Sequence, residues 1–202
     1  MRYSRGVPIS PPIAAAILWV VWGVSWIIAA AFASAAKVRT PRATLVPVRV
    51  LAVGGAVLLF LPPRTLNWTG PLAHRLWPSP PALDWAWVAL SGAGFAFCWW
   101  ARLRLGRLWS SAVTLKEDHR LIEDGPYGLV RHPIYAGLVI AAVTTAMTRA
   151  SPLALFGAGL MVIAFTLNAR VEEGFLRQQL GAASYNAYAR RVGMLIPRLG
   201  RS

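Results

Sequence analysis

The sequence predicts an all-α integral membrane protein with about five transmembrane helices and a cytoplasmic, amphipathic C-terminal helix. The mean hydropathy of the chain is +0.51, and only 14% of its 202 residues are charged, whereas soluble domains average about 25%. The apolar residues also fall in long runs rather than alternating with polar ones. Runs of about 18 or more apolar residues are long enough to cross a bilayer.

Five apolar runs are the candidate spans. Their approximate bounds are Ile13–Ala36, Ala43–Leu61, Ala82–Ala101, Ile134–Thr148 and Leu153–Ala169. Tryptophans stand at both ends of the third run, as in an interfacial aromatic belt. The fourth run is short for a span, so we expect it to cross with the help of its neighbours or of a buried start near Arg131. Residues Val171–Arg191 are predicted to form the amphipathic helix.

The chain divides into two parts. Residues 1–101 contain three spans, and residues 102–202 contain a long charged loop, two spans and the C-terminal helix. The first run is open to a second interpretation as a signal peptide cleaved near Ala35. Its apolar core is longer than the usual 7–15 residues, which favours a retained span.

The net charge of +14 predicts an orientation and a location. Most Lys and Arg residues fall in the loops after the first and third runs and after the fifth. The positive-inside rule then places the N-terminus outside and the C-terminus in the cytoplasm, in what we expect to be the plasma (inner) membrane. These basic residues would meet anionic lipid headgroups. No motif for nucleic-acid binding is present, so we predict no such partner.

The sequence offers no disulfide and no metal site. Cys98 is the single cysteine, and the three histidines are widely separated. We therefore predict no bound metal.

The acidic residues place the polar chemistry on the cytoplasmic side. All of them except Asp84 follow residue 116. Glu172 and Glu173 are adjacent carboxylates at the end of an apolar helix, where they need partners, and Arg131, His132 and Arg170 are the candidates. A solvated helix end is the alternative interpretation.

A second polar motif lies at the start of the fourth span. It reads Gly-Pro-Tyr-Gly-Leu-Val-Arg-His-Pro-Ile-Tyr-Ala-Gly over residues 125–137. Pro133 fits the first helical turn, so Arg131 and His132 lie beside a helix N-terminus that favours an anionic group. Gly137 permits the close approach of a ligand or another helix. An interfacial anchor made of Arg, His and Tyr is the alternative.

A third motif, Gly92-Ala93-Gly94, lies within the third span. It would suit a ligand that approaches the backbone. Small residues in spans are also typical of helix packing.

The order of these motifs resembles the isoprenylcysteine carboxyl methyltransferase family, which is grouped with the phospholipid N-methyltransferases. The resemblance covers roughly Leu121–Pro197 and includes the 125–137 motif, the two glutamates, and the later residues Leu180, Gly181, Tyr185, Tyr188, Arg191, Val192, Ile196 and Pro197. The chain departs from many relatives at Gly128, where they carry a basic or polar residue, and at Gly193, where they carry proline.

The resemblance implies an enzyme, a methyltransferase that binds S-adenosylmethionine in a helical membrane fold without a Rossmann domain. It implies cofactor binding by Tyr127, Val130, Arg131, His132 and Tyr135, and likeness to the phospholipid enzymes adds Gly92 and Gly94. By the resemblance, Glu172 and Glu173 close the site. We expect Arg131, Arg170, Glu172 and Glu173 to be the catalytic residues. Residues 102–202 would then be the catalytic half.

The methyl acceptor is expected to be a lipophilic small molecule or a lipidated protein, most simply a carboxylate. An ionised carboxylate needs no base, and Arg170 or Arg131 would hold it, whereas an amine would give its proton to one of the glutamates. The sequence leaves open the acceptor and the choice of O-, N- or S-methylation. Two other classes remain: an NADPH-dependent sterol or enone reductase, and a non-catalytic membrane transporter or scaffold. A transporter would place polar groups nearer the bilayer midplane.

Overall fold

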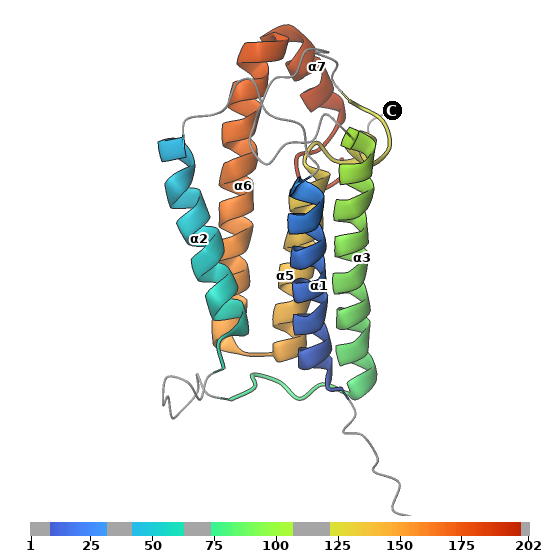
Figure 1. Cartoon of the computed structure of the whole chain (residues 1–202), viewed down its shortest axis with the longest axis vertical. Coiled ribbons are helices and arrows are strands. Elements are labelled where there is room, and N and C mark those ends of the chain that lie inside the picture. The colour runs from blue at the N-terminus through green and yellow to red at the C-terminus, as the bar shows by residue number, and fades with distance from the viewer. Residues whose placement is uncertain (1–8, 32–41, 63–73, 107–121, 199–202) are drawn as a thin grey trace, which may run out of the picture.

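The computed structural model describes residues 9–31, 42–62, 74–106 and 122–198 (Figure 1). Those residues form helices and no strands. The helices are α1 (Pro11–Ala31), α2 (Arg42–Phe60), α3 (Pro81–Leu105), α4 (Pro126–Leu129), α5 (Pro133–Arg149), α6 (Pro152–Leu180) and α7 (Ala182–Arg191). The predicted all-helical class is confirmed for the described part of the chain.

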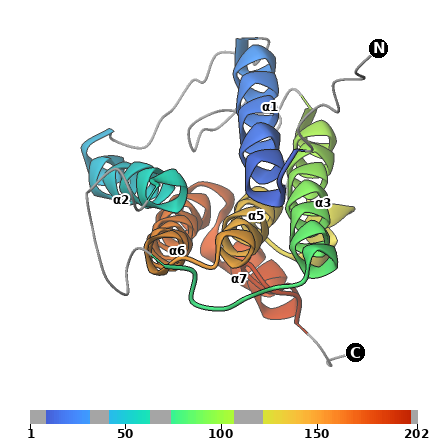
Figure 2. The same cartoon turned by 90° about the horizontal axis from the view of Figure 1, so that it is seen from below.

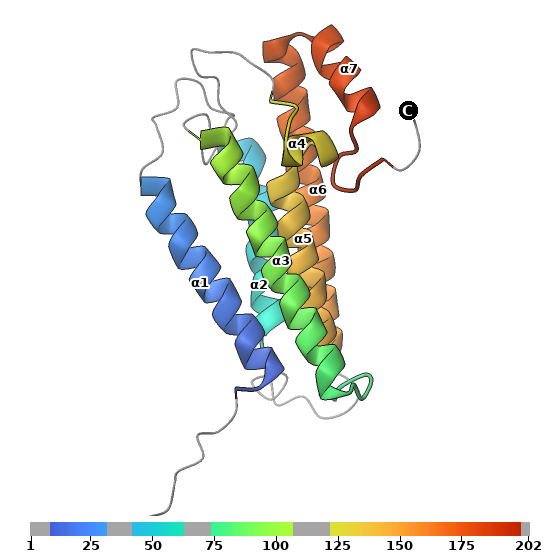
Figure 3. The same cartoon turned by 90° about the vertical axis from the view of Figure 1, so that its right-hand side faces the viewer.

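The five long helices run side by side along the length of the molecule (Figures 1 and 3). Seen along that direction, α5 lies among α1, α3 and α6, and α2 packs on α6 (Figure 2). The short helices α4 and α7 lie together at one end (Figure 3). This arrangement brings the start of α5 and the last turns of α6 to the same end of the bundle.

In the described part of the chain, two helices are long and apolar enough to cross a membrane, Pro11–Ala31 and Pro152–Gln179. Shorter apolar helices occupy Leu45–Phe60 and Pro133–Arg149. The count of five spans therefore stays a prediction. Large apolar side chains are exposed along α1 and α2, an arrangement that suits lipid better than water; they are Ile13, Ile17, Val20, Val21, Val24, Ile27, Ile28, Val46, Val50, Val53 and Val57.

The predicted boundaries of the C-terminal helix are wrong. Residues 171–180 continue α6 without a break, and a separate helix, α7, begins only at Ala182. The chain turns at Gly181, whose φ of 85° is a conformation that glycine adopts at no steric penalty. The two glutamates thus lie on an unbroken helix that rises from the apolar part of the bundle.

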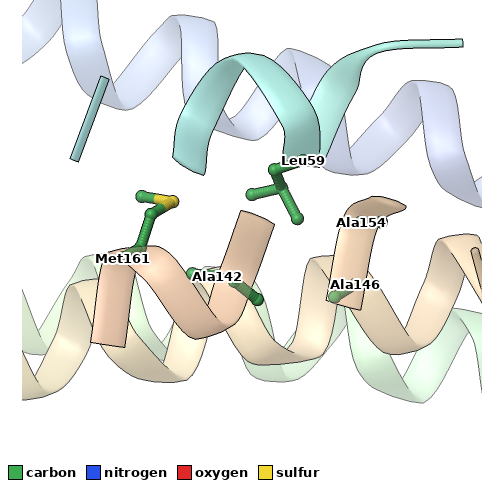
Figure 4. Close-up of a cluster of buried hydrophobic side chains, with 6 residues drawn as sticks. Leu59, Ala142, Ala146, Ala154 and Met161 are labelled. Atoms are coloured by element: carbon green, nitrogen blue, oxygen red, sulfur yellow. The ribbon is translucent and has the colours of Figure 1, made fainter. Parts of the chain in front are cut away.

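Small residues allow the helices to pack closely. Leu59 and Met161 meet the alanines Ala142, Ala146, Ala154 and Ala158 in a buried cluster that joins α2, α5 and α6 (Figure 4). Between α3 and α5 the backbones approach closely at Gly94 and Gly137. A Cβ atom on Gly94 would lie 2.6 Å from the carbonyl oxygen of Gly137. This contact fixes the position of the first turns of α5 against α3.

Candidate active site

Glu173 is the centre of a buried charge cluster. Arg131 donates from Nε to Glu173 Oε1 at 2.8 Å, and its Nη2 lies 2.6 Å from the same oxygen. Nε2 of His132 lies 3.3 Å from Oε1, and Nη2 of Arg177 donates to Oε2 at 2.9 Å. The side chain of Glu173 is only 6% exposed. Both oxygens of this buried carboxylate are paired, as the penalty for desolvating a charge requires.

Glu172 has a different environment. The hydroxyl of Tyr135 donates to Glu172 Oε2 at 3.1 Å, and Nδ1 of His132 lies 3.6 Å from the same oxygen. The side chain of Glu172 is 26% exposed, and among the described residues no hydrogen bond reaches its Oε1. Glu172 is therefore the carboxylate of the pair that keeps accepting capacity.

Aromatic stacking holds Tyr135 in place. Its ring stacks on His132, with ring centroids 5.7 Å apart, and on Phe165, with centroids 5.8 Å apart. His132 immediately precedes α5, Tyr135 lies in the first turn of α5, and Phe165 lies on α6. The stack joins α5 and α6 next to the two carboxylates, since Tyr135 and His132 contact Glu172 and His132 also contacts Glu173.

The segment after α7 fixes the Arg131–His132 turn. The backbone N–H groups of Arg131 and His132 donate to the carbonyl oxygens of Gly193 and Met194 at 2.8 and 3.1 Å. Nη1 of Arg131 also donates to the carbonyl oxygens of Ala189 and Val192. Arg131 thus links α5, α6 and the C-terminal segment.

Gly193 departs from the family pattern, and its surroundings show a local reason. A Cβ atom there would overlap the carbonyl oxygen of Ile196. In this chain the turn that follows α7 accepts only glycine at position 193 without rearrangement.

The structure brings together five of the predicted site residues: Arg131, His132, Tyr135, Glu172 and Glu173. Tyr127 and Val130 lie beside them. The carbonyl oxygen of Tyr127 accepts a hydrogen bond from the hydroxyl of Tyr188 at 2.6 Å, and Val130 is buried in a parallel bridge with Gly193. Both support the turn through backbone contacts. Their binding roles stay predictions.

Arg170 is not part of this cluster. It is exposed, and among the described residues no hydrogen bond or ion pair connects it to Glu172 or Glu173. Arg177, four residues after Glu173, pairs with Oε2 of Glu173 instead. The i, i+4 spacing of Glu173 and Arg177 was the sequence signal for this contact.

Gly92 and Gly94 face neighbouring helices. A Cβ atom on Gly92 would lie 3.9 Å from Leu18 of α1, and Gly94 abuts Gly137 of α5. These contacts favour the helix-packing interpretation that the sequence left open. Cofactor binding by either glycine stays untested.

The imidazole of His132 lies between two carboxylates. Ionised carboxylates only accept hydrogen bonds, so an imidazole with Glu172 near Nδ1 and Glu173 near Nε2 has reason to carry both protons. Burial lowers the pKa of His132, but the hydrogen bonds and charges of Glu172 and Glu173 outweigh burial and raise the pKa above 6.5.

The raised pKa of His132 predicts a pH dependence of stability. A group whose pKa is raised on folding stabilises the folded state fully at a pH below its pKa in the unfolded chain. That stabilisation is lost as the pH rises through its pKa in the folded protein. The stability difference between the protein and a His132→Gln variant is therefore expected to be largest below about pH 6.5 and to shrink above the raised pKa. The unfolding midpoints of the two proteins in detergent, compared from pH 5.5 to 9, measure this difference. A difference that grows with pH would contradict a protonated His132.

Among the described residues, no group of three or more His, Cys, Asp or Glu side chains is arranged to hold a metal ion. The charges of the cluster are instead balanced by arginine and histidine.

Comparison with known proteins confirms the resemblance predicted from the motifs. Residues 87–178 match the model of the isoprenylcysteine carboxyl methyltransferase family. A probable protein-S-isoprenylcysteine O-methyltransferase of Oryza sativa subsp. indica is 35% identical over 96 residues, which are 46% of this chain and 49% of the relative. Protein-S-isoprenylcysteine O-methyltransferase B of Arabidopsis thaliana is 31% identical over 101 residues, 48% of this chain and 50% of the relative.

The chain spans about half the length of these curated relatives. Among solved structures, the eukaryotic intramembrane Ras methyltransferase is similar with a TM-score of 0.46 and 24% identity, over 74% of this chain and 51% of that one. The part of the chain that matches the family model contains α5, most of α3 and α6 up to Gln178, and thus the charge cluster around Glu173.

Proposed function

We propose that this protein, whose residues 87–178 are isoprenylcysteine carboxyl methyltransferase-like, is a membrane-embedded methyltransferase that uses S-adenosylmethionine to methylate the carboxylate of a lipophilic acceptor. The observation that carries the proposal is that this family-matched segment holds Arg131, His132, Tyr135, Glu172 and Glu173 in one cluster.

The residues of the cluster fit the charges of S-adenosylmethionine. The cofactor has a sulfonium and an ammonium group, which suit a partly exposed carboxylate with a free oxygen, and Glu172 offers one. It also has a carboxylate, which suits an exposed guanidinium or a helix N-terminus. We therefore propose that Glu172, Tyr135 and the Arg131–His132 turn hold the cofactor.

Bound S-adenosylmethionine supplies a methyl group on an activated sulfonium centre. The chain's own residues then have two tasks, which are to hold the acceptor in line and to exclude water. An acceptor carboxylate is ionised at neutral pH and needs no base. Arg170 is exposed and lies about one helical turn before Glu173, and we propose that it binds the carboxylate of the acceptor.

The names of the relatives suggest the class of acceptor, an S-prenylated cysteine with a free α-carboxylate. An isoprenoid chain partitions into the bilayer, and the exposed apolar surface of α1 and α2 is consistent with a protein that works there. We also propose that all five long helices cross the membrane, with the N-terminus outside and the site facing the cytoplasm, in the plasma (inner) membrane.

The first test is binding and turnover by the full chain in detergent. We expect saturable binding of S-adenosylhomocysteine by isothermal titration and transfer of labelled methyl from S-adenosylmethionine to S-farnesyl-N-acetylcysteine. Glu172→Gln should weaken binding about tenfold or more, because it removes the charge proposed to face the ammonium group that S-adenosylhomocysteine shares with the cofactor. Glu123→Gln, which alters an exposed carboxylate paired with Arg191, is the matched control.

Other outcomes would point elsewhere. Tight binding of NADPH without binding of S-adenosylhomocysteine would replace the proposal with a reductase. Binding of neither by folded protein would favour a transporter or scaffold. Transfer to a phospholipid amine but not to the prenylcysteine would keep the methyltransferase and change its acceptor.

A further inference from the structure

The position of Asn168 is unusual for a polar residue. It lies on α6, three residues after Phe165 and four before Glu172, so the three side chains share one face of the helix. An unpaired amide in an apolar helix is unfavourable, and polar residues at such positions are typically paired or functional. Asn168 makes such a contact across the bundle: its Nδ2 donates to the hydroxyl of Tyr135 at 2.9 Å.

The hydrogen bonds at the Tyr135 hydroxyl have a defined direction. The hydroxyl has one proton to donate, and it donates it to Glu172 Oε2. An ionised carboxylate can only accept, so the group on the other side of the hydroxyl must be a donor. The amide nitrogen of Asn168 is that donor. The three groups form a chain that runs from Asn168 through Tyr135 to Glu172.

The ring of Tyr135 is fixed by its stacking on His132 and Phe165. Stacking sets where the hydroxyl oxygen lies but leaves its proton free to rotate. The bond from Asn168 occupies one acceptor position of the oxygen, and the hydroxyl proton is donated to Glu172 Oε2. Glu172 is also the carboxylate that keeps an oxygen without a hydrogen bond among the described residues.

We infer that Asn168 is a positioning residue that acts through the hydroxyl of Tyr135 to orient the carboxylate of Glu172 toward the bound cofactor. The inference rests on the proposed function, because it takes Glu172 to face the cofactor. Asn168 itself touches neither the cofactor nor the acceptor in this scheme.

The test is a double-mutant cycle on the full chain in detergent. Asn168→Ala is expected to raise the dissociation constant of S-adenosylhomocysteine about tenfold, the range for one hydrogen bond in a partly buried network. The same substitution in a Tyr135→Phe background should have almost no further effect, since the hydroxyl through which it acts is gone. A residue that only supports packing would give additive losses instead.

Two further variants separate positioning from folding. Thr166→Val removes a polar side chain from the neighbouring part of α6. Among the described residues its hydroxyl bonds only to the carbonyl of Val162, and the variant should bind as the parent does. Asn168→Asp keeps the shape of the side chain but replaces the donor with an acceptor that competes for the Tyr135 proton. It should bind no better than Asn168→Ala.

The outcomes distinguish this inference from the proposed function. If the parent binds S-adenosylhomocysteine and Asn168→Ala binds equally well, or loses the same factor with and without the Tyr135 hydroxyl, the role of Asn168 is refuted and the methyltransferase stands. If the folded parent itself does not bind, the proposed function fails and the inference fails with it.

Discussion

Replacing Glu173 with glutamine is expected to destabilise the protein by about 3–5 kcal/mol, the usual consequence of removing one partner from a buried ion pair. The substitution leaves Arg131 and the imidazolium of His132 without their shared carboxylate, in a place where the Arg131 side chain is only 9% exposed. Thermal unfolding of the detergent-purified protein, followed by circular dichroism, measures the loss. We also expect binding of S-adenosylhomocysteine to be lost, because the same cluster holds the Arg131–His132 turn.

The matched control for Glu173→Gln is again Glu123→Gln. It makes the same chemical change in an exposed ion pair. The side chain of Arg191 is 62% exposed and that of Glu123 is 38% exposed. Exposed pairs contribute about 0–1 kcal/mol. Equal, small shifts of the unfolding midpoint in the two variants would show that Glu173 does not have the central role that its contacts indicate.

The pairing of Glu173 illustrates what the sequence made predictable. Two adjacent carboxylates at the end of an apolar helix were expected to need cationic partners, and Arg131, His132 and Arg170 were the candidates. Glu173 pairs with Arg131 and His132. Among the described residues, no hydrogen bond or ion pair joins Arg170 to either glutamate. The different environments of Glu172 and Glu173 were not predictable, because they depend on the rotation of α6 about its axis relative to α5.

Other supporting contacts were hidden for a similar reason. Asn168 bonds to Tyr135, which is 33 residues away in the chain, and Tyr188 bonds to Tyr127, which is 61 residues away. No local pattern specifies such pairs, since they follow from how the helices pack. The single helix formed by residues 152–180 was also missed, because the change from apolar to charged composition near residue 170 looked like a boundary. A helix that leaves the apolar part of a bundle changes composition without ending.

The sequence left two interpretations open for each glycine. Gly94 suited either a cofactor or helix packing, and Gly137 suited either a ligand or another helix. In the structure the two glycines meet each other, and the second alternative for Gly137 is the one found. A small residue in a span indicates that another group approaches the helix backbone closely. The sequence alone does not tell whether that group is a ligand or the backbone of a neighbouring helix.

Replacing Gly137 with alanine is therefore expected to separate α3 from α5. The added Cβ would lie 2.6 Å from Sγ of Cys98 and would overlap the carbonyl oxygen of Gly94. Backbone atoms cannot rotate away as a flexible side chain can, so the helices must shift. Overpacking of this kind typically destabilises by about 1–3 kcal/mol, which outweighs the gain of about 1 kcal/mol in helix propensity. The unfolding midpoint should fall. Binding of S-adenosylhomocysteine should weaken as well, because Gly137 lies two residues after Tyr135 and five after His132.

Gly159→Ala is the matched control, since a Cβ atom at Gly159 of α6 would meet nothing within 4 Å. That variant gains helix propensity without a clash and is expected to unfold at the same temperature or higher. Opposite shifts in the two variants would establish that the approach of α3 and α5 at Gly94 and Gly137 holds the first turns of α5, and with them His132 and Tyr135, in place. If Gly137→Ala behaved like Gly159→Ala, the two helices would be further apart than the structure has them. The reason for glycine at position 137 would then have to be sought in a ligand.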